Sequence, residues 1–159
     1  MGMVQAKKEG DSVYDIGCLG KISNYQKSKD GRILINLTGI SRFKILKEIS
    51  SKKLYREFQV DYKNFGNDAE NIHNEIDADS LMEKAKTFFK RNGLLLNWRE
   101  FEKLDSAQKI NTLAMIAPIT NEEKQKLLEA ISIENKIDTL ESIISFYLYE
   151  TGLNNQTIQ

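Results

Sequence analysis

Apolar and polar residues alternate along the first part of the chain with the two-residue period of β-strands. The segment Ile16–Ile49 predicts three consecutive antiparallel strands, because three alternating runs are separated by turn residues. Asp30 and Gly31 separate the first two strands, and this pair tolerates the positive φ of a tight hairpin turn. Gly39 follows the second strand, where we expect it to turn the chain or to bulge the ladder. A fourth strand is predicted over Arg56–Tyr62.

Two glycines interrupt the first of these strands. Gly17 and Gly20 would weaken an ordinary strand, so they indicate a bend or the close approach of another backbone. Met3–Gln5 has the apolar character of a further short strand, and the polar run Lys7–Tyr14 predicts a surface loop.

From Ala78 onward the apolar residues follow the period of amphipathic helices. The first helix is expected to end at Asn92-Gly93, and a long final helix is predicted from about Glu134 to Glu150, ended by Gly152. Three pairs of residues have the spacing of a helix cap and its first-turn partner, namely Asn97 with Glu100, Asp105 with Gln108, and Thr120 with Glu123. The side chains expected in the helical core include Trp98, Phe101, Leu127, Leu128 and Ile131.

The change of period defines the expected organisation of the chain. We predict a strand half over residues 1–65, a linker over 66–79, a helical bundle over 80–152 and a tail over 153–159. The fold class is therefore α+β. A length of 159 residues, with 40% hydrophobic and 29% charged residues, is typical of one globular domain or of a domain with an appended subdomain.

Charge is distributed unevenly although the net charge is zero. Residues 1–65 contain 13 Lys and Arg against 7 Asp and Glu, giving +6, whereas residues 66–159 contain 10 against 16, giving −6. This asymmetry either steers partners or holds the two halves together, and we prefer the second interpretation because the basic residues are scattered between apolar ones.

Candidate chemistry is sparse. His73 is the only histidine and has no neighbouring metal ligands, and Cys18 follows a strand pattern and has no histidine beside it in the sequence. The sequence lacks GxxxxGKS, GxxxxGKT and GxGxxG, so we assign no catalytic, metal-binding or cofactor-binding residue and expect no cofactor. We expect neither a membrane-spanning segment nor a signal peptide, and the predicted location is cytoplasmic.

Several short motifs resemble the amino-terminal substrate-binding domain of the ATP-dependent Lon proteases. In the strand half these are the GxxGxI run at Gly17–Ile22, Asp30-Gly31-Arg32 before an apolar strand, and the string Leu37–Phe43. In the helical half they are Leu95–Trp98, the break at Pro118 and the run Glu123–Glu129.

This resemblance implies a PUA-like pseudo-barrel followed by a carboxy-terminal helical bundle. In that family further strands and a helix precede the strand that corresponds to Met3–Gln5, so we expect the strand half to lack its opening strands and to leave one sheet edge uncovered. Self-association through that edge is then expected. The implied function is non-catalytic recognition of unfolded or damaged polypeptide, with a protease as partner. The alternative is a PUA-like RNA-binding module, and nucleic acid is the less favoured partner.

Seven residues are singled out in the strand half. Tyr25, Leu34, Leu46 and Leu54 are expected opposite to the main apolar face, either as a second core face, which we prefer, or as contacts for polypeptide. Gly39, Arg42 and Phe43 are expected to be structural. Arg42 either binds a substrate carboxylate or pairs with an acid of this chain, and we prefer the pair.

Overall fold

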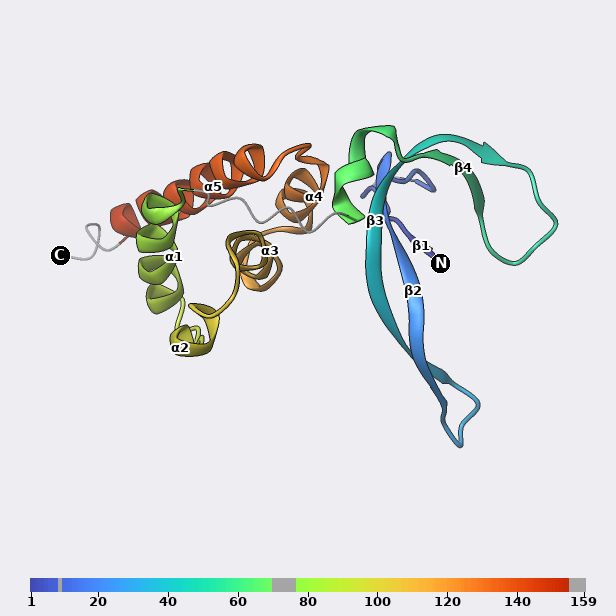
Figure 1. Cartoon of the computed structure of the whole chain (residues 1–159), viewed down its shortest axis with the longest axis horizontal. Helices are drawn as coiled ribbons and strands as arrows, with labels where there is room; N and C mark the ends of the chain where they lie inside the picture. The colour runs from blue at the N-terminus through green and yellow to red at the C-terminus, as the bar shows by residue number, and fades with distance from the viewer. Residues whose placement is uncertain (9, 70–76, 155–159) are drawn as a thin grey trace. The chain divides into compact units, whose positions relative to one another are not determined.

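A computed structural model describes residues 1–8, 10–69 and 77–154, so His73 lies outside the described residues. The chain divides into two compact units, Met1–Ile72 and His73–Gln159, which we call the strand unit and the helical unit. Figure 1 shows their elements. The strand unit consists of β1 (Gly2–Met3), β2 (Ile16–Lys27), β3 (Ile33–Ile49), β4 (Glu57–Asp61) and the 3-10 helix η1 (Lys63–Ala69).

The four strands form one antiparallel sheet in the order β1-β2-β3-β4. The predicted hairpin turn is confirmed, because Gly31 has a φ of 87° and the Arg32 N–H donates to Asp30 Oδ1 at 3.1 Å. The antiparallel sheet is therefore as expected, whereas its closure into a pseudo-barrel stays a prediction.

The prediction of a chain turn at Gly39, and with it of a separate third strand, is wrong. β3 continues from Ile33 to Ile49 as one strand, so Ile16–Ile49 holds two strands and not three. Gly20 pairs with Gly39 while Leu19 pairs with Ser41, which leaves Ile40 as an extra residue on β3. The alternative interpretation of this position, a β-bulge, is the one that the register supports.

Phe43 and Phe65 are the buried large apolar residues in the described part of the strand unit. Phe43 packs edge-on against Tyr62 with 6.3 Å between ring centroids. A Cβ added at Gly17 would lie 2.7 Å from Phe43 Cζ and 2.6 Å from the Met3 carbonyl oxygen. The predicted close approach of another backbone at Gly17 is thus confirmed, and the glycine lets β1 and Phe43 meet β2.

The helical unit consists of α1 (Asp79–Arg91), α2 (Trp98–Phe101), α3 (Ser106–Ile116), α4 (Asn121–Glu129) and α5 (Ile133–Asn154). The predicted end of α1 is confirmed by Gly93, which has a φ of 65°. Reciprocal capping boxes begin α3 and α4, and the Asn97 side chain accepts from the backbone N–H of Glu100 at α2. The buried core includes Leu81, Phe88, Phe101, Ile110, Leu113, Leu127, Leu140 and Ile144.

Several boundaries differ from the sequence-based expectation, and β1 covers Gly2–Met3 instead of Met3–Gln5. α4 ends at Glu129, so Ile131 lies beyond it and is exposed instead of buried. α5 continues through Gly152 to Asn154, since a single glycine weakens a helix by only about 1 kcal/mol. We expected a linker from residue 66 onward, but η1 extends to Ala69. Phe65 is buried and anchors this helix, so the first residues of the expected linker belong to η1.

We expect Gly17→Ala to destabilise the strand unit by about 1–3 kcal/mol, because the new methyl group would overlap the Met3 carbonyl oxygen and the Phe43 ring. Hydrogen exchange of amides in residues 1–69, followed by mass spectrometry, measures this change. Gly66→Ala is the matched control, since its Cβ would meet no atom within 4 Å. Equal acceleration of exchange in both variants would contradict the packing at Gly17.

Candidate functional site

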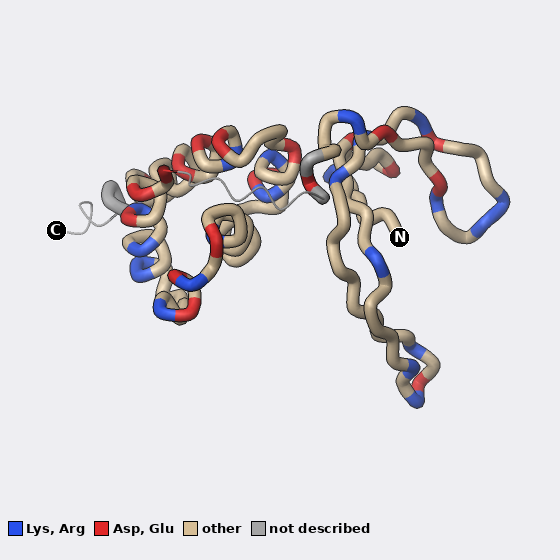
Figure 2. The backbone as a smooth tube through the Cα atoms, viewed as in Figure 1, with Lys and Arg blue, Asp and Glu red and all other residues tan. Residues whose placement is uncertain are grey.

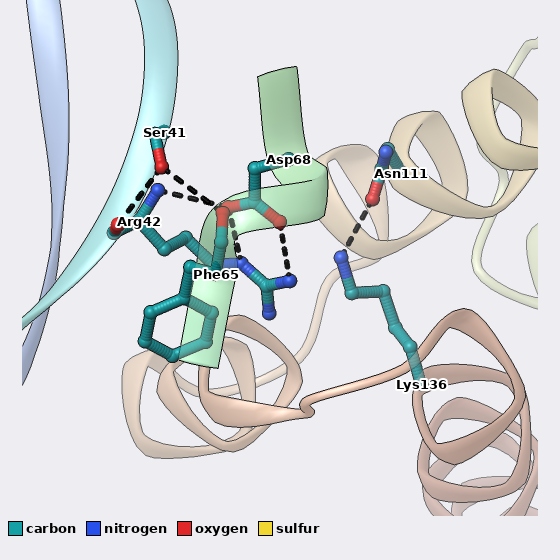
Figure 3. Close-up of polar contacts among 6 residues, drawn as sticks. All are labelled: Ser41, Arg42, Phe65, Asp68, Asn111 and Lys136. Atoms are coloured by element: carbon teal, nitrogen blue, oxygen red, sulfur yellow. Dashed lines mark hydrogen bonds and ion pairs between the residues drawn. The ribbon is translucent and has the colours of Figure 1, made fainter. Parts of the chain in front are cut away.

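Arg42 joins β3 to η1 through an ion pair with Asp68 (Figure 3). Arg42 Nη2 lies 2.7 Å from Asp68 Oδ1, while Arg42 Nε and the Arg42 backbone N–H both donate to Asp68 Oδ2 at 2.8 Å. The two side chains are only 13% and 19% exposed. Bidentate geometry and partial burial make this pair stronger than an ordinary surface pair.

The guanidinium group of Arg42 also lies over the ring of Phe65, with 4.5 Å between its central carbon and the ring centroid. The Ser41 hydroxyl donates to the Phe65 carbonyl oxygen at 3.3 Å, which adds a second connection to η1. Arg42 thus pairs with an acid of its own chain, which is the pairing that we preferred, and the pair connects β3 to η1. Sequence reasoning missed Asp68, although the isolated Phe65 in a polar run could have indicated a buried segment.

The outer halves of β2 and β3 extend as a two-stranded ribbon beyond the short strands β1 and β4 (Figure 1). Ile22 pairs with Leu37 and Asn24 pairs with Asn36, which leaves Ser23 as an extra residue in β2. Directly opposed residues share a face of a sheet. The register therefore places five apolar residues on one face, which we call the ribbon face, namely Ile22, Tyr25, Ile33, Ile35 and Leu37.

Tyr25 lies on a different face from the one that we expected. Strict alternation puts it opposite to Ile33 and Ile35, but the bulge at Ser23 shifts the pattern, and Tyr25 pairs with Ile35. Leu34 lies on the other face, as expected, where it pairs with Gln26.

The ribbon face is not a core. Tyr25 is 72% exposed, Ile33 is 62% exposed and Ile22 is also exposed, whereas Ile35 and Leu37 are half-buried. Leu34, Leu46 and Leu54 are exposed as well. The preferred interpretation of Tyr25, Leu34, Leu46 and Leu54 as a second core face is therefore wrong.

Local geometry explains the exposure of Leu46 and Leu54. Leu46 is the extra residue where Ile45 pairs with Val60 and Lys47 pairs with Gln59, so it has no partner in β4. Leu54 lies in the loop between β3 and β4 and is fully exposed. Neither residue belongs to the ribbon face, so the four predicted contact residues do not form one site.

The ribbon also has two open edges in the described part of the chain. β1 pairs with Cys18 and Leu19 only, and β4 pairs with β3 from Lys44 onward. Residues 21–27 of β2 and residues 33–40 of β3 therefore have no strand on their outer side. Such edges present backbone N–H and C=O groups to any extended chain. Pairing of two copies through an edge stays a prediction.

Cys18 carries the one thiol of the chain. Burial raises the pKa of the Cys18 thiol, with a further contribution from Asp68, which opposes formation of the reactive thiolate. Groups of three or more metal-ligating side chains are absent from the described residues. Within the same residues, no helix has the length and apolar character needed to span a bilayer.

Polar networks in the helical unit are structural. Glu123 Oε2 accepts hydrogen bonds from the Thr120 N–H at 2.7 Å and from the Tyr147 hydroxyl at 2.9 Å, so the cap of α4 is tied to α5. Burial raises the pKa of the Tyr147 phenol, and its bond to Glu123 raises the pKa further. A phenol that stays protonated can act as a hydrogen-bond donor but not as a base.

The geometry defines an α+β domain whose strand unit carries an exposed apolar face. A family model described as the ATP-dependent protease La (LON) substrate-binding domain matches residues 2–145. The chain belongs to this family.

Two curated relatives carry the name Lon protease and are much longer than this chain. This chain is 25% identical to the Lon protease of Bacillus thuringiensis (strain Al Hakam) over 150 residues, which cover 84% of this chain and 17% of that protein. It is 24% identical to the Lon protease of Brevibacillus choshinensis over 144 residues, which cover 86% of this chain and 18% of that protein. The chain thus spans less than a fifth of these relatives.

Solved structures agree on the fold. The crystal structure of the Lon N-terminal domain protein from Xanthomonas campestris matches with a TM-score of 0.61 and 14% identity, over 91% of this chain and 75% of that chain. The N-terminal domain of the Mycobacterium avium complex Lon protease matches with a TM-score of 0.59 and 18% identity, over 91% of this chain and 77% of that chain. The pairing of an antiparallel sheet with a helical unit is therefore the fold of Lon N-terminal domains.

We expect Asp68→Asn to destabilise the docking of η1 by about 1–3 kcal/mol, because it leaves the half-buried Arg42 guanidinium without its charged partner. Hydrogen exchange at β3 and η1 measures the change. Asp30→Asn is the matched control, since the Arg32–Asp30 pair is 86% and 48% exposed and a solvent-exposed pair contributes little to stability. Equal effects of the two substitutions would show that the Arg42 pair is no more than a surface contact.

Proposed function

We propose that this chain is a non-catalytic recognition domain that binds unfolded or damaged polypeptide for ATP-dependent proteolysis in the cytoplasm. Membership of the Lon substrate-binding domain family supports substrate recognition as its general role. The observation that carries the specific proposal is the exposed ribbon face, because soluble monomers rarely leave contiguous apolar side chains uncovered without using them.

Unfolded chains expose the two features that this ribbon can bind. Their apolar side chains can be buried against Tyr25, Ile33 and Ile22, and each Å² of apolar surface removed from water contributes about 25 cal/mol. Their extended backbone can pair with an open edge of β2 or β3, as in β-augmentation. Backbone pairing and apolar burial tolerate many sequences, which suits a domain that recognises the unfolded state.

The chemical steps of proteolysis belong to other parts of a protease in this proposal. Neither a phosphate-binding loop nor a nucleophile with a base was assigned, so the domain holds substrate while hydrolysis of ATP and of the peptide bond takes place elsewhere. The RNA-binding alternative is not favoured by the family membership and is not proposed.

We expect the double variant Tyr25→Ser with Ile33→Ser to weaken binding of a denatured, fluorescently labelled reporter protein by about tenfold or more, because two large apolar contacts are lost. Fluorescence anisotropy measures the affinity. Both side chains are exposed, so the fold should be retained, and unchanged amide exchange in the strand unit would verify it.

Leu95→Ser is the matched control, because Leu95 is fully exposed in the helical unit. The proposal predicts wild-type affinity for this variant. Absence of binding by the wild-type chain, or equal losses in the ribbon variant and in Leu95→Ser, would contradict recognition by the ribbon face.

A further inference from the structure

Lysines lie beside the exposed apolar positions of the strand unit. Lys27 pairs with Ile33 at the outer end of the ribbon face, and Lys29 lies in the adjoining turn. In the other exposed segments, Lys47 follows Leu46 and Lys52 lies two residues before Leu54. Figure 2 shows basic residues at the end of the β2–β3 hairpin and in the loop between β3 and β4.

The neighbouring acids do not neutralise these lysines. Four carboxylates of the strand unit already bind other cations, in the pairs Asp30–Arg32, Glu48–Arg56, Glu57–Lys53 and Asp68–Arg42. Within the described residues, Lys27, Lys29, Lys47 and Lys52 are exposed and form no ion pair. Part of the positive charge of the strand unit therefore lies on these four lysines, beside exposed apolar side chains.

We propose that the strand unit selects polypeptide segments whose apolar residues are flanked by Asp or Glu over segments flanked by Lys or Arg. This inference rests on the proposed function and names its substrate class. An apolar side chain bound on the ribbon face brings its flanking residues to Lys27 and Lys29, within the Debye length of about 10 Å at 0.1 M salt. Carboxylates there are attracted, whereas ammonium groups are repelled.

A polypeptide suits this surface better than a nucleic acid. The apolar residues of the ribbon face are aliphatic except for Tyr25. Single-stranded nucleic acid is instead bound by several aromatic side chains on which its bases stack. The open edges of the ribbon also offer backbone partners that only a polypeptide can use in strand pairing.

Three unstructured peptides test the selectivity. They share the same apolar residues at the same spacing and carry Asp and Glu, Ser and Asn, or Lys and Arg between them. We expect the acidic peptide to bind the full chain about fivefold to tenfold tighter than the neutral one at low salt, and the basic peptide to bind weakest, because several weak ion pairs act together. High salt should bring the three affinities together.

The variant Lys27→Gln with Lys29→Gln should lose the advantage of the acidic peptide and keep the affinity for the neutral one. Its matched control is Lys90→Gln with Lys126→Gln, which removes the same charge from exposed lysines of the helical unit and should bind like the wild type.

Each outcome separates the two proposals. Equal binding of all three peptides would overturn the charge selectivity and leave the proposed function standing, whereas absence of binding to any peptide would overturn the proposed function. A single-stranded RNA serves as a further probe. If it binds as tightly as the acidic peptide, the surface recognises polyanions in general and the inference of an acidic polypeptide is wrong.

Discussion

Burial of Phe43 and Phe65 is the interaction on which the strand unit depends. Phe43 packs against Tyr62 and lies close to Gly2 of β1 and Gly17 of β2, and only a glycine at position 17 leaves room for it. Phe65 fixes η1 on β3, with Arg42 lying over its ring and binding Asp68. These contacts concentrate the small core of the unit around residues 42–45 of β3, at one end of the ribbon.

The outer ribbon lies beyond this core. Its strands remain paired with each other by backbone hydrogen bonds, so it keeps its shape without being covered. The apolar residues that would form a core in a closed sheet therefore face solvent, with Tyr25 and Ile33 the most exposed of the ribbon face. Exposed apolar surface favours association with other chains. We interpret the ribbon as a surface kept accessible for that purpose, with lysines at its margin restricting which chains bind.

Sequence patterns predicted most of the secondary structure because its signals are local. The Asp30-Gly31 turn and the capping boxes at Asp105 and Thr120 depend on residues close in the chain, and the structure has them. The bulges at Ser23, Ile40 and Leu46 depend on the register between strands, which no single run of residues reveals. A bulge reverses the alternation of faces, and for this reason Tyr25 was assigned to the wrong face.

The candidate site was predicted only in part, because its contacts join residues that are far apart in the sequence. Arg42 and Phe43 lie within the string Leu37–Phe43, but the partner Asp68 lies 26 residues from Arg42 in the sequence, so no local pattern links the two. Exposure depends on the whole sheet and on what covers it, so the alternation around Leu34 did not reveal that this side chain is exposed. Apolar residues on two faces of a strand therefore do not distinguish a core from a binding surface.

Hydrogen exchange of the wild-type chain with and without an unfolded polypeptide rich in Asp, Glu and apolar residues tests the central claim most directly. Binding on the ribbon predicts slower exchange of amides in residues 21–27 and 33–40, where the open edges lie. Protection confined to the helices within residues 77–154, with unchanged exchange along the ribbon, would contradict the account.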